Sequence, residues 1–196
     1  MTEPNLPLVV VKIGGSLFDH QALAPGLRRW LAEQPHGRYV FVPGGGAMAD
    51  CIRDYHRVHG VDENACHWLA IETMVINARL VQTLLGDCGE VDHPVAASSD
   101  RPSVLNAITF CRQDDCERNA LPHDWRVTSD SIAARAAEVG NASRFVLLKS
   151  TALPDGIDWP EAAHCGLVDA MFPHIVQRSG LMVSWLHFRT LLDGFC

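Results

Sequence analysis

Two lysines stand at the ends of apolar runs that are typical of buried strands. Lys12 closes "LVVVK" just before Gly14 and Gly15, and Lys149 closes the apolar part of "RFVLLKS". The chain has sixteen basic residues, of which two are lysines, leaving fourteen arginines. Codon bias alone would explain such numbers, but a compact ammonium is needed where a planar guanidinium does not fit. We therefore expect both lysines to meet a phosphate.

Glycine-rich turns follow the first two predicted strands. Gly14 and Gly15 follow one strand, and Gly44, Gly45 and Gly46 join the next strand to a helix in "VPGGGAMAD". Backbone N–H groups in such turns, together with a helix N-terminus, suit a phosphate. Turns of this kind are also common in α/β folds without a ligand. Neither turn has the spacing of a P-loop or a dinucleotide-binding motif, which disfavours both classes.

These parts together favour phosphoryl transfer. The migrating group spreads negative charge over its oxygens, so catalysis depends on positioned cations and N–H donors. Two ammonium groups near one substrate repel each other, and Asp130 is the candidate anion that holds Lys12 and Lys149 together. The alternative for Asp130 is an ordinary interaction with the helix dipole, because it falls in the first turn of a predicted helix.

The elements that must position these residues alternate between strand and helix. Apolar periodicity and turn residues predict strands at 8–13, 38–43, 103–111, 144–150 and 181–188. They predict helices within 21–34, 47–59, 63–85 and 127–140 and near 169–178, with polar loops at 87–102 and 112–125. In the helix at 127–140, Ser129 is the expected cap and Gly140 the stop. The order predicts an α/β protein with parallel strands.

Composition narrows the classes further. At 196 residues and 47% hydrophobic, the chain forms one domain or a closely joined pair. A net charge of −7 without a basic patch argues against nucleic acid. No segment has the roughly 18 apolar residues of a membrane span, and the N-terminus has no basic start, so we expect a cytoplasmic protein. Scattered cysteines without a Cys-x-x-Cys pair predict reduced thiols, at positions 51, 66, 88, 111, 116, 165 and 196.

Four motifs carry a resemblance to a known family. "VVVKIGGSLF", "FVPGGGAMAD", "VTSDSIAARAA" and "VLLKSTALPDG", in this order, resemble the amino acid kinase family, which includes acetylglutamate, carbamate and uridylate kinases. The resemblance implies a three-layer α/β/α sandwich with a mainly parallel central sheet, as one domain over 1–196. It also implies an acceptor-binding and catalytic part over about 1–125 and a shortened nucleotide-binding part over about 126–196.

The resemblance implies roles for individual residues. The catalytic set is Lys12, Asp130 and Lys149, in which Lys12 bridges the transferring phosphoryl group and Asp130 organises the lysines. The phosphate and nucleotide set is Gly14, Gly15, Ser16, Ser150 and Thr151. The acceptor set is Gly44, Gly45, Gly46 and, from its own chemistry, Arg53. The cofactors implied are ATP and Mg²⁺, and we expect the metal to arrive with ATP, without a metal site built from protein side chains.

Short matches suggest an acceptor. The short chain, "HWLAIE" and "TSDSIA" are similar to the small kinases that convert (5-(aminomethyl)furan-3-yl)methyl phosphate to its diphosphate in methanofuran-type one-carbon cofactor synthesis. Arg53 would bind the acceptor phosphate through two parallel hydrogen bonds, or it would be an exposed arginine on a helix surface. His67 and Trp68 would line the acceptor pocket or have packing roles. His56 and His59 have a spacing that suits metal but lack partner ligands, so we interpret them as solvated.

Alternatives remain open. The usual glycine-rich, lysine-bearing stretch of the nucleotide half is replaced by "GLVDAMFPHIVQ". A non-catalytic nucleotide-binding, oxoanion-binding or storage protein of the same fold is therefore an alternative, as is a kinase of the uridylate, carbamate or isopentenyl phosphate type. The expected partners are a small phosphorylated substrate and further copies of the chain, which would meet through the apolar face of the helix at 63–85. We expect no nucleic acid and no membrane partner.

Overall fold

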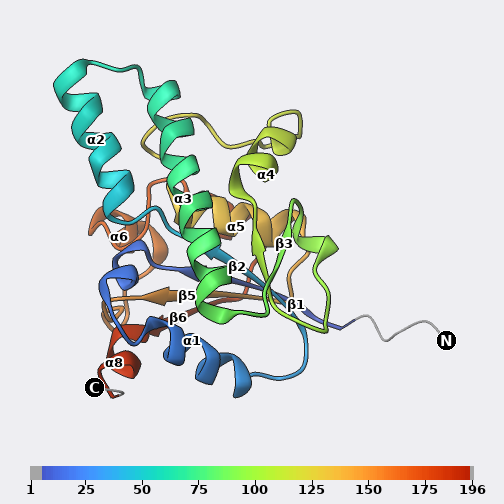
Figure 1. Ribbon diagram of the computed structural model, residues 1–196. Coiled ribbons are helices and arrows are strands. Elements are labelled where there is room, and N and C mark those ends of the chain that lie inside the picture. Colours follow the sequence, from blue (N-terminus) through green and yellow to red (C-terminus); the bar gives the residue numbers. More distant parts are fainter. Residues whose placement is uncertain (1–5, 195–196) are drawn as a thin grey trace.

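Six strands form one sheet between layers of helices in the computed structural model, which describes residues 6–194 (Figure 1). Two sequence expectations fall partly outside the described residues. They concern the start of the N-terminal segment, which has no basic start, and Cys196, which was expected to be a reduced thiol. The strands lie in the order β3-β4-β2-β1-β5-β6, and each described pair is parallel. Their bounds are β1 (Leu8–Ile13), β2 (Arg38–Pro43), β3 (Gly89–Val91), β4 (Ser103–Leu105), β5 (Arg144–Lys149) and β6 (Val183–His187).

Helices cover both faces of this sheet, which confirms the three-layer α/β prediction (Figure 1). One apolar cluster joins the sheet to α1 (Leu23–Ala32) and α8 (Phe188–Asp193). The other joins it to α4 (Ala107–Asp114), α5 (Ser129–Val139), α6 (Trp159–His164) and α7 (Phe172–Ser179). The long α3 (Glu63–Leu85) contributes to both clusters. The remaining elements are α2 (Ala47–His59) and the short 3-10 helices η1 (Gly15–Asp19) and η2 (Pro94–Ala96).

Strand alternation decides where the two lysines emerge. Leu8 and Val10 of β1 belong to the cluster on the α5 side, and Lys12 continues the same alternation. On β5 the same holds for Phe145 and Leu147, which precede Lys149 by four and two positions. Carboxyl ends of parallel strands meet at one edge of the sheet, so the lysines leave the same face at the same edge.

The segment after β3 differs from prediction. The predicted strand over 103–111 is wrong beyond Leu105, because α4 begins at Ala107. Asn106 caps this helix, with its side-chain oxygen accepting from the Thr109 N–H at 3.3 Å. Ala107, Phe110 and Cys111 are buried at helical spacing, which a strand interpretation overlooked. The predicted loop at 112–125 consequently begins inside α4.

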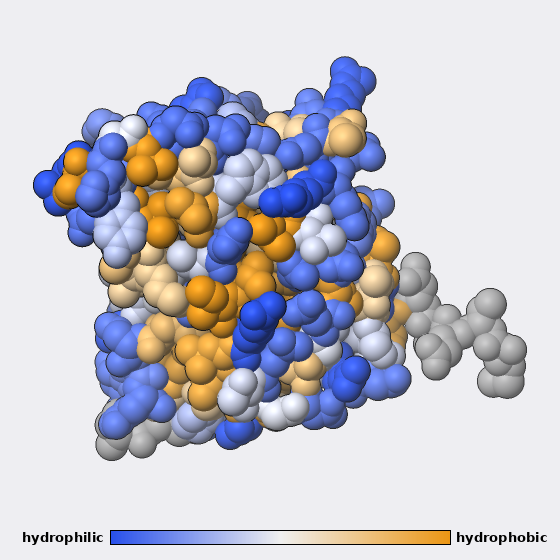
Figure 2. Space-filling view, turned by 45° about the horizontal axis from the view of Figure 1, so that its top comes forward, coloured by the Kyte–Doolittle hydropathy of each residue, from blue (hydrophilic) through white to orange (hydrophobic). Residues whose placement is uncertain are grey.

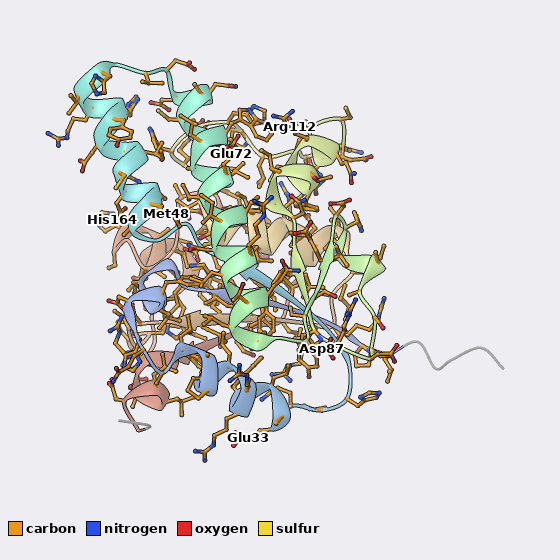
Figure 3. The ribbon with its side chains drawn as sticks, viewed as in Figure 1. Glu33, Met48, Glu72, Asp87, Arg112 and His164 are labelled. Carbon is orange, nitrogen blue, oxygen red and sulfur yellow. The ribbon has the colours of Figure 1, made fainter. Side chains whose placement is uncertain are left out.

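Smaller differences occur at other element ends. Thr128, not the predicted Ser129, caps α5, and its hydroxyl oxygen accepts from the Asp130 N–H at 3.4 Å. Gly140 ends this helix as predicted. The short helices α6 and α8 and the strand β3 were not predicted, because each is too short to establish a clear apolar period. Figure 3 shows side chains filling the space between sheet and helices, whereas Glu33 and Glu72 are exposed.

A pair of helices projects beyond the sheet. α2 has no buried residue and packs on α3, and α2 projects beyond the sheet together with the N-terminal part of α3 (Figure 1). Large exposed apolar side chains on this pair are Tyr55, Val58, Leu69, Ile76 and Leu80. Figure 2 shows apolar surface mixed with charged groups on the face that it presents. No helix within residues 6–194 combines the length and hydropathy that crossing a bilayer requires.

Candidate active site

A single buried carboxylate lies between the two lysines. Lys12 Nζ is 2.7 Å from Asp130 Oδ1, and Lys149 Nζ is 2.9 Å from Asp130 Oδ2. All three residues are buried, with relative exposures of 4%, 9% and 6% for Lys12, Lys149 and Asp130. Lys149 also donates to the backbone carbonyl of Leu167 at 2.7 Å. The carboxylate therefore balances two ammonium groups that would otherwise repel each other at short range.

The charges of this triad are set by burial and by one another. Burial alone would raise the pKa of Asp130, but the charges of Lys12 and Lys149 outweigh it, and the pKa is lowered. Asp130 is therefore an anion at neutral pH. Burial and the neighbouring Lys12 lower the pKa of Lys149 to about 8. Two ammonium groups thus share one carboxylate within the triad below about pH 8, a local excess of positive charge that suits an anionic ligand.

Asp169 fixes the position of the helix that carries Asp130. Its carboxylate accepts from Thr128 N–H at 2.7 Å, from Ser131 N–H at 3.0 Å and from the Ser131 hydroxyl. It also accepts from Phe172 N–H at 3.0 Å, at the start of α7. Burial and the charge of Asp130 raise the pKa of Asp169. Sequence reasoning missed this residue, because the contact joins loops 41 positions apart.

The two glycine turns touch each other. A methyl group on Gly15 would lie 2.4 Å from the nitrogen of Gly46, and one on Gly44 would lie 2.8 Å from the nitrogen of Gly15. Gly46 also has φ +59° and ψ −148°, a conformation that side chains disfavour. Among the described residues, no acceptor is assigned to the N–H groups of Gly45 and Gly46. These N–H groups stand ahead of the N-terminus of α2, as a phosphate-binding turn requires.

Gly45 has a different reason to be glycine. A methyl group there would lie 2.3 Å from Thr73 Oγ1 and 2.7 Å from Ala49 Cβ, so the turn packs tightly against α3 and α2. Asn77, buried on α3, donates from its amide to the carbonyls of Gly44 at 2.6 Å and Gly45 at 3.1 Å. Sequence reasoning missed Asn77, whose position inside an apolar helix face was its only signal.

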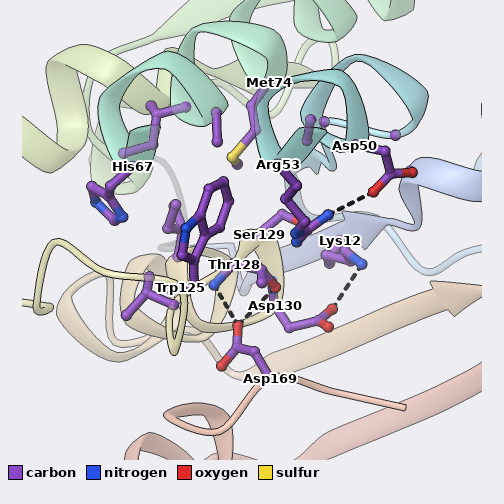
Figure 4. Close-up of a pocket in the computed structure, with 18 of the residues that line it drawn as sticks. Lys12, Asp50, Arg53, His67, Met74, Trp125, Thr128, Ser129, Asp130 and Asp169 are labelled. Carbon is purple, nitrogen blue, oxygen red and sulfur yellow. Dashed lines mark hydrogen bonds and ion pairs between the residues drawn. The ribbon is translucent and has the colours of Figure 1, made fainter. Parts of the chain in front are cut away.

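A cavity of about 390 Å³ opens beside these groups (Figure 4). Of the predicted site residues, those that line it are Lys12, Gly15, Ser16, Gly45, Gly46, Arg53 and Asp130. The cavity continues between α2, α3 and the segment before α5, where Met74 and Trp125 face it. Its volume lies near the lower end of the range for small-molecule sites. One end therefore holds the Lys12 ammonium and the N–H groups of the glycine turns beside Asp130 and Asp169, and the other is largely apolar.

The remaining predicted residues lie at the edge of the triad, outside the cavity lining. Gly14 and Gly44 form the backs of the turns, with Gly14 N–H donating to the Leu148 carbonyl at 2.8 Å. Ser150 shares a hydroxyl hydrogen bond of 2.7 Å with Ser16. The carbonyl of Thr151 accepts from Trp185 Nε1 at 2.9 Å. The predicted nucleotide residues Ser16, Ser150 and Thr151 thus gather on the β5 side.

Arg53 is an exposed helix arginine, and it also lines the cavity at its apolar end. Its guanidinium donates to Asp50 at 2.6 Å and lies 5.2 Å from the centroid of the Trp125 ring. Trp125 was missed by sequence reasoning, because it falls in a polar loop without periodicity. His56 is half-buried, and its ring centroid lies 5.9 Å from that of Trp125. The interpretation of His56 as solvated is therefore wrong.

His67 lines the cavity, whereas Trp68 does not. Burial and the nearby His123, which stacks on it at 5.0 Å, lower the pKa of His67 to about 4. His67 is consequently neutral at pH 7 and supplies no cation to a phosphate. Trp68 packs on His123 instead, with ring centroids 4.9 Å apart. No cluster of three metal-ligating side chains occurs within residues 6–194.

Fold and site together define an α/β protein with paired lysines and glycine turns at the carboxyl edge of a parallel sheet. Residues 7–152 match the family described as "Amino acid kinase family". The chain therefore belongs to the amino acid kinase family. The match covers the four motifs of the sequence analysis except the last four residues of the final one.

Named relatives agree with this assignment. The chain is 27% identical over 125 residues to "[5-(aminomethyl)furan-3-yl]methyl phosphate kinase" of Methanocaldococcus jannaschii, a match that covers 63% of this chain and 57% of that protein. The chain thus spans less than two thirds of the length of this relative. The structure is similar to uridylate kinase from Archaeoglobus fulgidus, with a TM-score of 0.61, 19% identity and coverage of 95% and 94% of the two chains.

Two further solved structures share the fold. UMP kinase from Bacillus anthracis has a TM-score of 0.62 at 12% identity, with 97% of this chain and 93% of that chain covered. Aspartate kinase from Synechocystis has a TM-score of 0.60 at 13% identity, with 91% of this chain and 37% of that chain covered. At these identities the likeness concerns the fold alone.

Proposed function

We propose that this protein is an ATP-dependent phosphotransferase that acts on a small phosphorylated acceptor. The observation that carries the proposal is the bridge of Asp130 between Lys12 and Lys149, at 2.7 Å and 2.9 Å, beside two abutting glycine turns. Such an arrangement offers fixed cations and N–H donors to a migrating phosphoryl group. Membership of the amino acid kinase family supports the same reaction class.

The reaction balances without a protein nucleophile. An oxygen of the acceptor phosphate attacks the γ-phosphorus of ATP, and the bond from that phosphorus to the ADP oxygen breaks. A diphosphate forms, and ADP leaves with the electron pair of the broken bond. The attacking phosphate is already ionised near neutral pH, so no general base is needed. In this proposal Lys12 stabilises the transferring group, because it lines the cavity from the end of β1.

ATP and the acceptor bind on opposite sides of the triad in this proposal. We assign ATP to the β5 side, near Lys149, Ser16, Ser150 and Thr151, and the acceptor to the cavity with Gly45, Gly46 and Arg53. Bound Mg²⁺ would neutralise phosphate charge. We expect the ATP phosphates and water to hold it, because the Asp130 carboxylate is already engaged by two ammonium groups.

The acceptor that we propose is [5-(aminomethyl)furan-3-yl]methyl phosphate, which would be converted to its diphosphate. The name of the M. jannaschii relative supports this choice at 27% identity. We further propose a cytoplasmic location, a nucleotide-binding part over about 126–196, and assembly of copies through α3, which exposes Leu69, Ile76 and Leu80. Exposed apolar side chains on one helix support such a contact.

A coupled assay for ADP release tests the reaction class. Purified protein would be given MgATP with each of [5-(aminomethyl)furan-3-yl]methyl phosphate, UMP, carbamate and isopentenyl phosphate, and phosphorus NMR would identify the product. We expect ADP and a new diphosphate with the furanyl compound, and neither in the Lys12→Ala variant. ATP binding without ADP release for any acceptor would reject the kinase and favour the non-catalytic alternative.

A further inference from the structure

Trp125 presents an indole to the apolar end of the cavity. The side chain is half-buried and lines the cavity together with Ile71 and Met74 of α3. Figure 4 shows the Trp125 ring in the middle of this end, with the Met74 sulfur above it and Arg53 beside it. An indole in this place offers a flat apolar surface to whatever enters the cavity.

The backbone on both sides of Trp125 is braced. Asp124 accepts from the Arg126 N–H at 2.9 Å, and its carboxylate pairs with the Arg126 guanidinium at 2.7 Å. The Arg126 carbonyl in turn accepts from the Met171 N–H at 3.2 Å. The segment is therefore held in place before any ligand arrives. A preorganised ring loses little conformational freedom when it packs against a ligand.

Arg53 has partners that a ligand can replace. Its guanidinium pairs with Asp50, whose side chain is 71% exposed, and its second neighbour is the Trp125 ring. A phosphate is a better partner for a guanidinium than an exposed carboxylate, because it accepts two parallel hydrogen bonds and carries more charge. A ring that stacks on Trp125 would occupy the surface that Arg53 now shares.

We propose that Trp125 and Arg53 together select the acceptor: Trp125 receives the flat unsaturated ring of a small phosphomonoester, and Arg53 binds its phosphate. This inference rests on the proposed function, since it concerns the acceptor end of that site. The cavity volume of about 390 Å³ limits the ligand to a small molecule. Ring and phosphate recognition lie on different elements, so each can be tested separately.

The test compares two phosphomonoesters that differ in the ring. Calorimetric titration and steady-state kinetics would use [5-(aminomethyl)furan-3-yl]methyl phosphate and the open-chain 5-aminopentyl phosphate. We expect Trp125→Leu to weaken binding of the furanyl compound by about tenfold, the scale of an aromatic pair, and to change the open-chain compound by less than about threefold. Trp125→Phe should keep most of the preference for the ring. Arg53→Gln should weaken the binding of both compounds, because both carry the phosphate.

Trp68→Leu is the matched control. Trp68 is another half-buried tryptophan that packs on His123 but does not line the cavity, so its removal should leave the ring preference intact. Circular dichroism would establish that each variant is folded. Equal losses for both compounds in Trp125→Leu, no loss, or the same loss in Trp68→Leu would overturn the inference.

The outcomes also separate this inference from the proposed function. Ring-selective binding that depends on Trp125, without ADP release, would reject the kinase and keep the selectivity. Turnover with an unchanged ring preference in Trp125→Leu would keep the kinase and reject the selectivity. A wild-type protein that binds neither compound would overturn the inference directly.

Discussion

The side-chain amide of Asn77 donates a hydrogen bond of 2.6 Å to the carbonyl of Gly44. A second bond from the same nitrogen reaches the carbonyl of Gly45 at 3.1 Å. Asn77 is 3% exposed, and the long helix α3 thus holds the triple-glycine turn from behind. Because both carbonyls accept hydrogen bonds from a side chain of α3, the turn keeps its shape where it borders the cavity.

Asn77→Leu tests the importance of this bond for the site. Leucine has a similar volume but no donor, so two buried carbonyls lose their partner, which costs about 1–3 kcal/mol of the free energy of unfolding. We also expect the Michaelis constant for the acceptor to rise, because the turn loosens. Denaturant unfolding and steady-state kinetics measure the two effects.

Gln82→Leu is a matched control for Asn77→Leu. Gln82 lies on the same helix and donates to the Cys88 carbonyl at 3.3 Å, outside the cavity. It should lower stability at most and leave the Michaelis constant unchanged. A destabilised Asn77→Leu protein with wild-type kinetics would mean that the bond serves the fold alone.

Lys12 is predicted to act mainly in the transition state. Lys12→Ala should lower the turnover number by about a hundredfold or more, the cost of one lost preorganised donor, with a smaller change in ATP affinity. Lys12→Arg should be severely impaired as well, because a buried planar guanidinium cannot occupy the place of the ammonium 2.7 Å from Asp130. Turnover, ATP titration and melting temperature are the measurements; full activity in Lys12→Arg would contradict the proposed role.

Lys149 gives a prediction about pH. Burial and the neighbouring Lys12 lower its pKa to about 8, so it is charged below that pH and neutral above it. The kcat/KM for ATP should therefore fall as the pH rises through about 8. In Lys149→Arg the guanidinium stays charged, so activity should be lower but without this alkaline decline. An identical decline in both proteins would assign it to another group.

The lowered pKa of Lys149 makes the free energy of unfolding rise with pH, whereas it makes the activity fall. The ordinary pKa of 10.5 applies to the unfolded chain, and the folded pKa is about 8. Between these values the unfolded chain holds more protons than the native protein, so Lys149 makes the free energy of unfolding rise with pH through this window. Its contribution is complete above the unfolded pKa and is lost as the pH falls through the folded one. Denaturant unfolding of wild type and Lys149→Met across this range isolates the effect.

Local rules located the charged triad from the sequence. Lys12 and Lys149 end apolar runs, and the alternation of a strand places both on one face once the strands are parallel. Charge balance made Asp130 a candidate for the anion between two ammonium groups, with an ordinary helix-dipole interaction as the alternative, and its contacts of 2.7 Å and 2.9 Å with the lysines come from the structure. The βα order in turn predicted an α/β protein with parallel strands, because a helical crossover usually joins a parallel pair, whereas the three layers were implied by the family resemblance.

Tertiary contacts account for what the sequence did not indicate. Asp169 and Trp125 belong to the site because loops distant in sequence meet at the start of α5, and no periodic pattern records such a meeting. Asn77 does lie within a recognisable pattern, but a polar residue in an apolar helix face has many explanations, so its role could not be inferred from the sequence. The strand predicted over 103–111 failed beyond Leu105 because the four apolar residues within 107–111 suit a helix equally well.

Gly46 provides the last prediction, in which backbone conformation and close contact act together. Its φ is +59°, and a methyl group would lie 2.7 Å from the Gly15 carbonyl oxygen, so alanine would push the two glycine turns apart. Gly60 is the matched control, because its φ is +63° but nothing lies within 4 Å of the added methyl group. Gly60→Ala should cost about 1–2 kcal/mol with unchanged kinetics. Gly46→Ala should cost more and raise the Michaelis constants for both substrates at least tenfold, measured by unfolding and steady-state kinetics. Equal behaviour of the two variants would mean that contact between the turns is unimportant for phosphate binding.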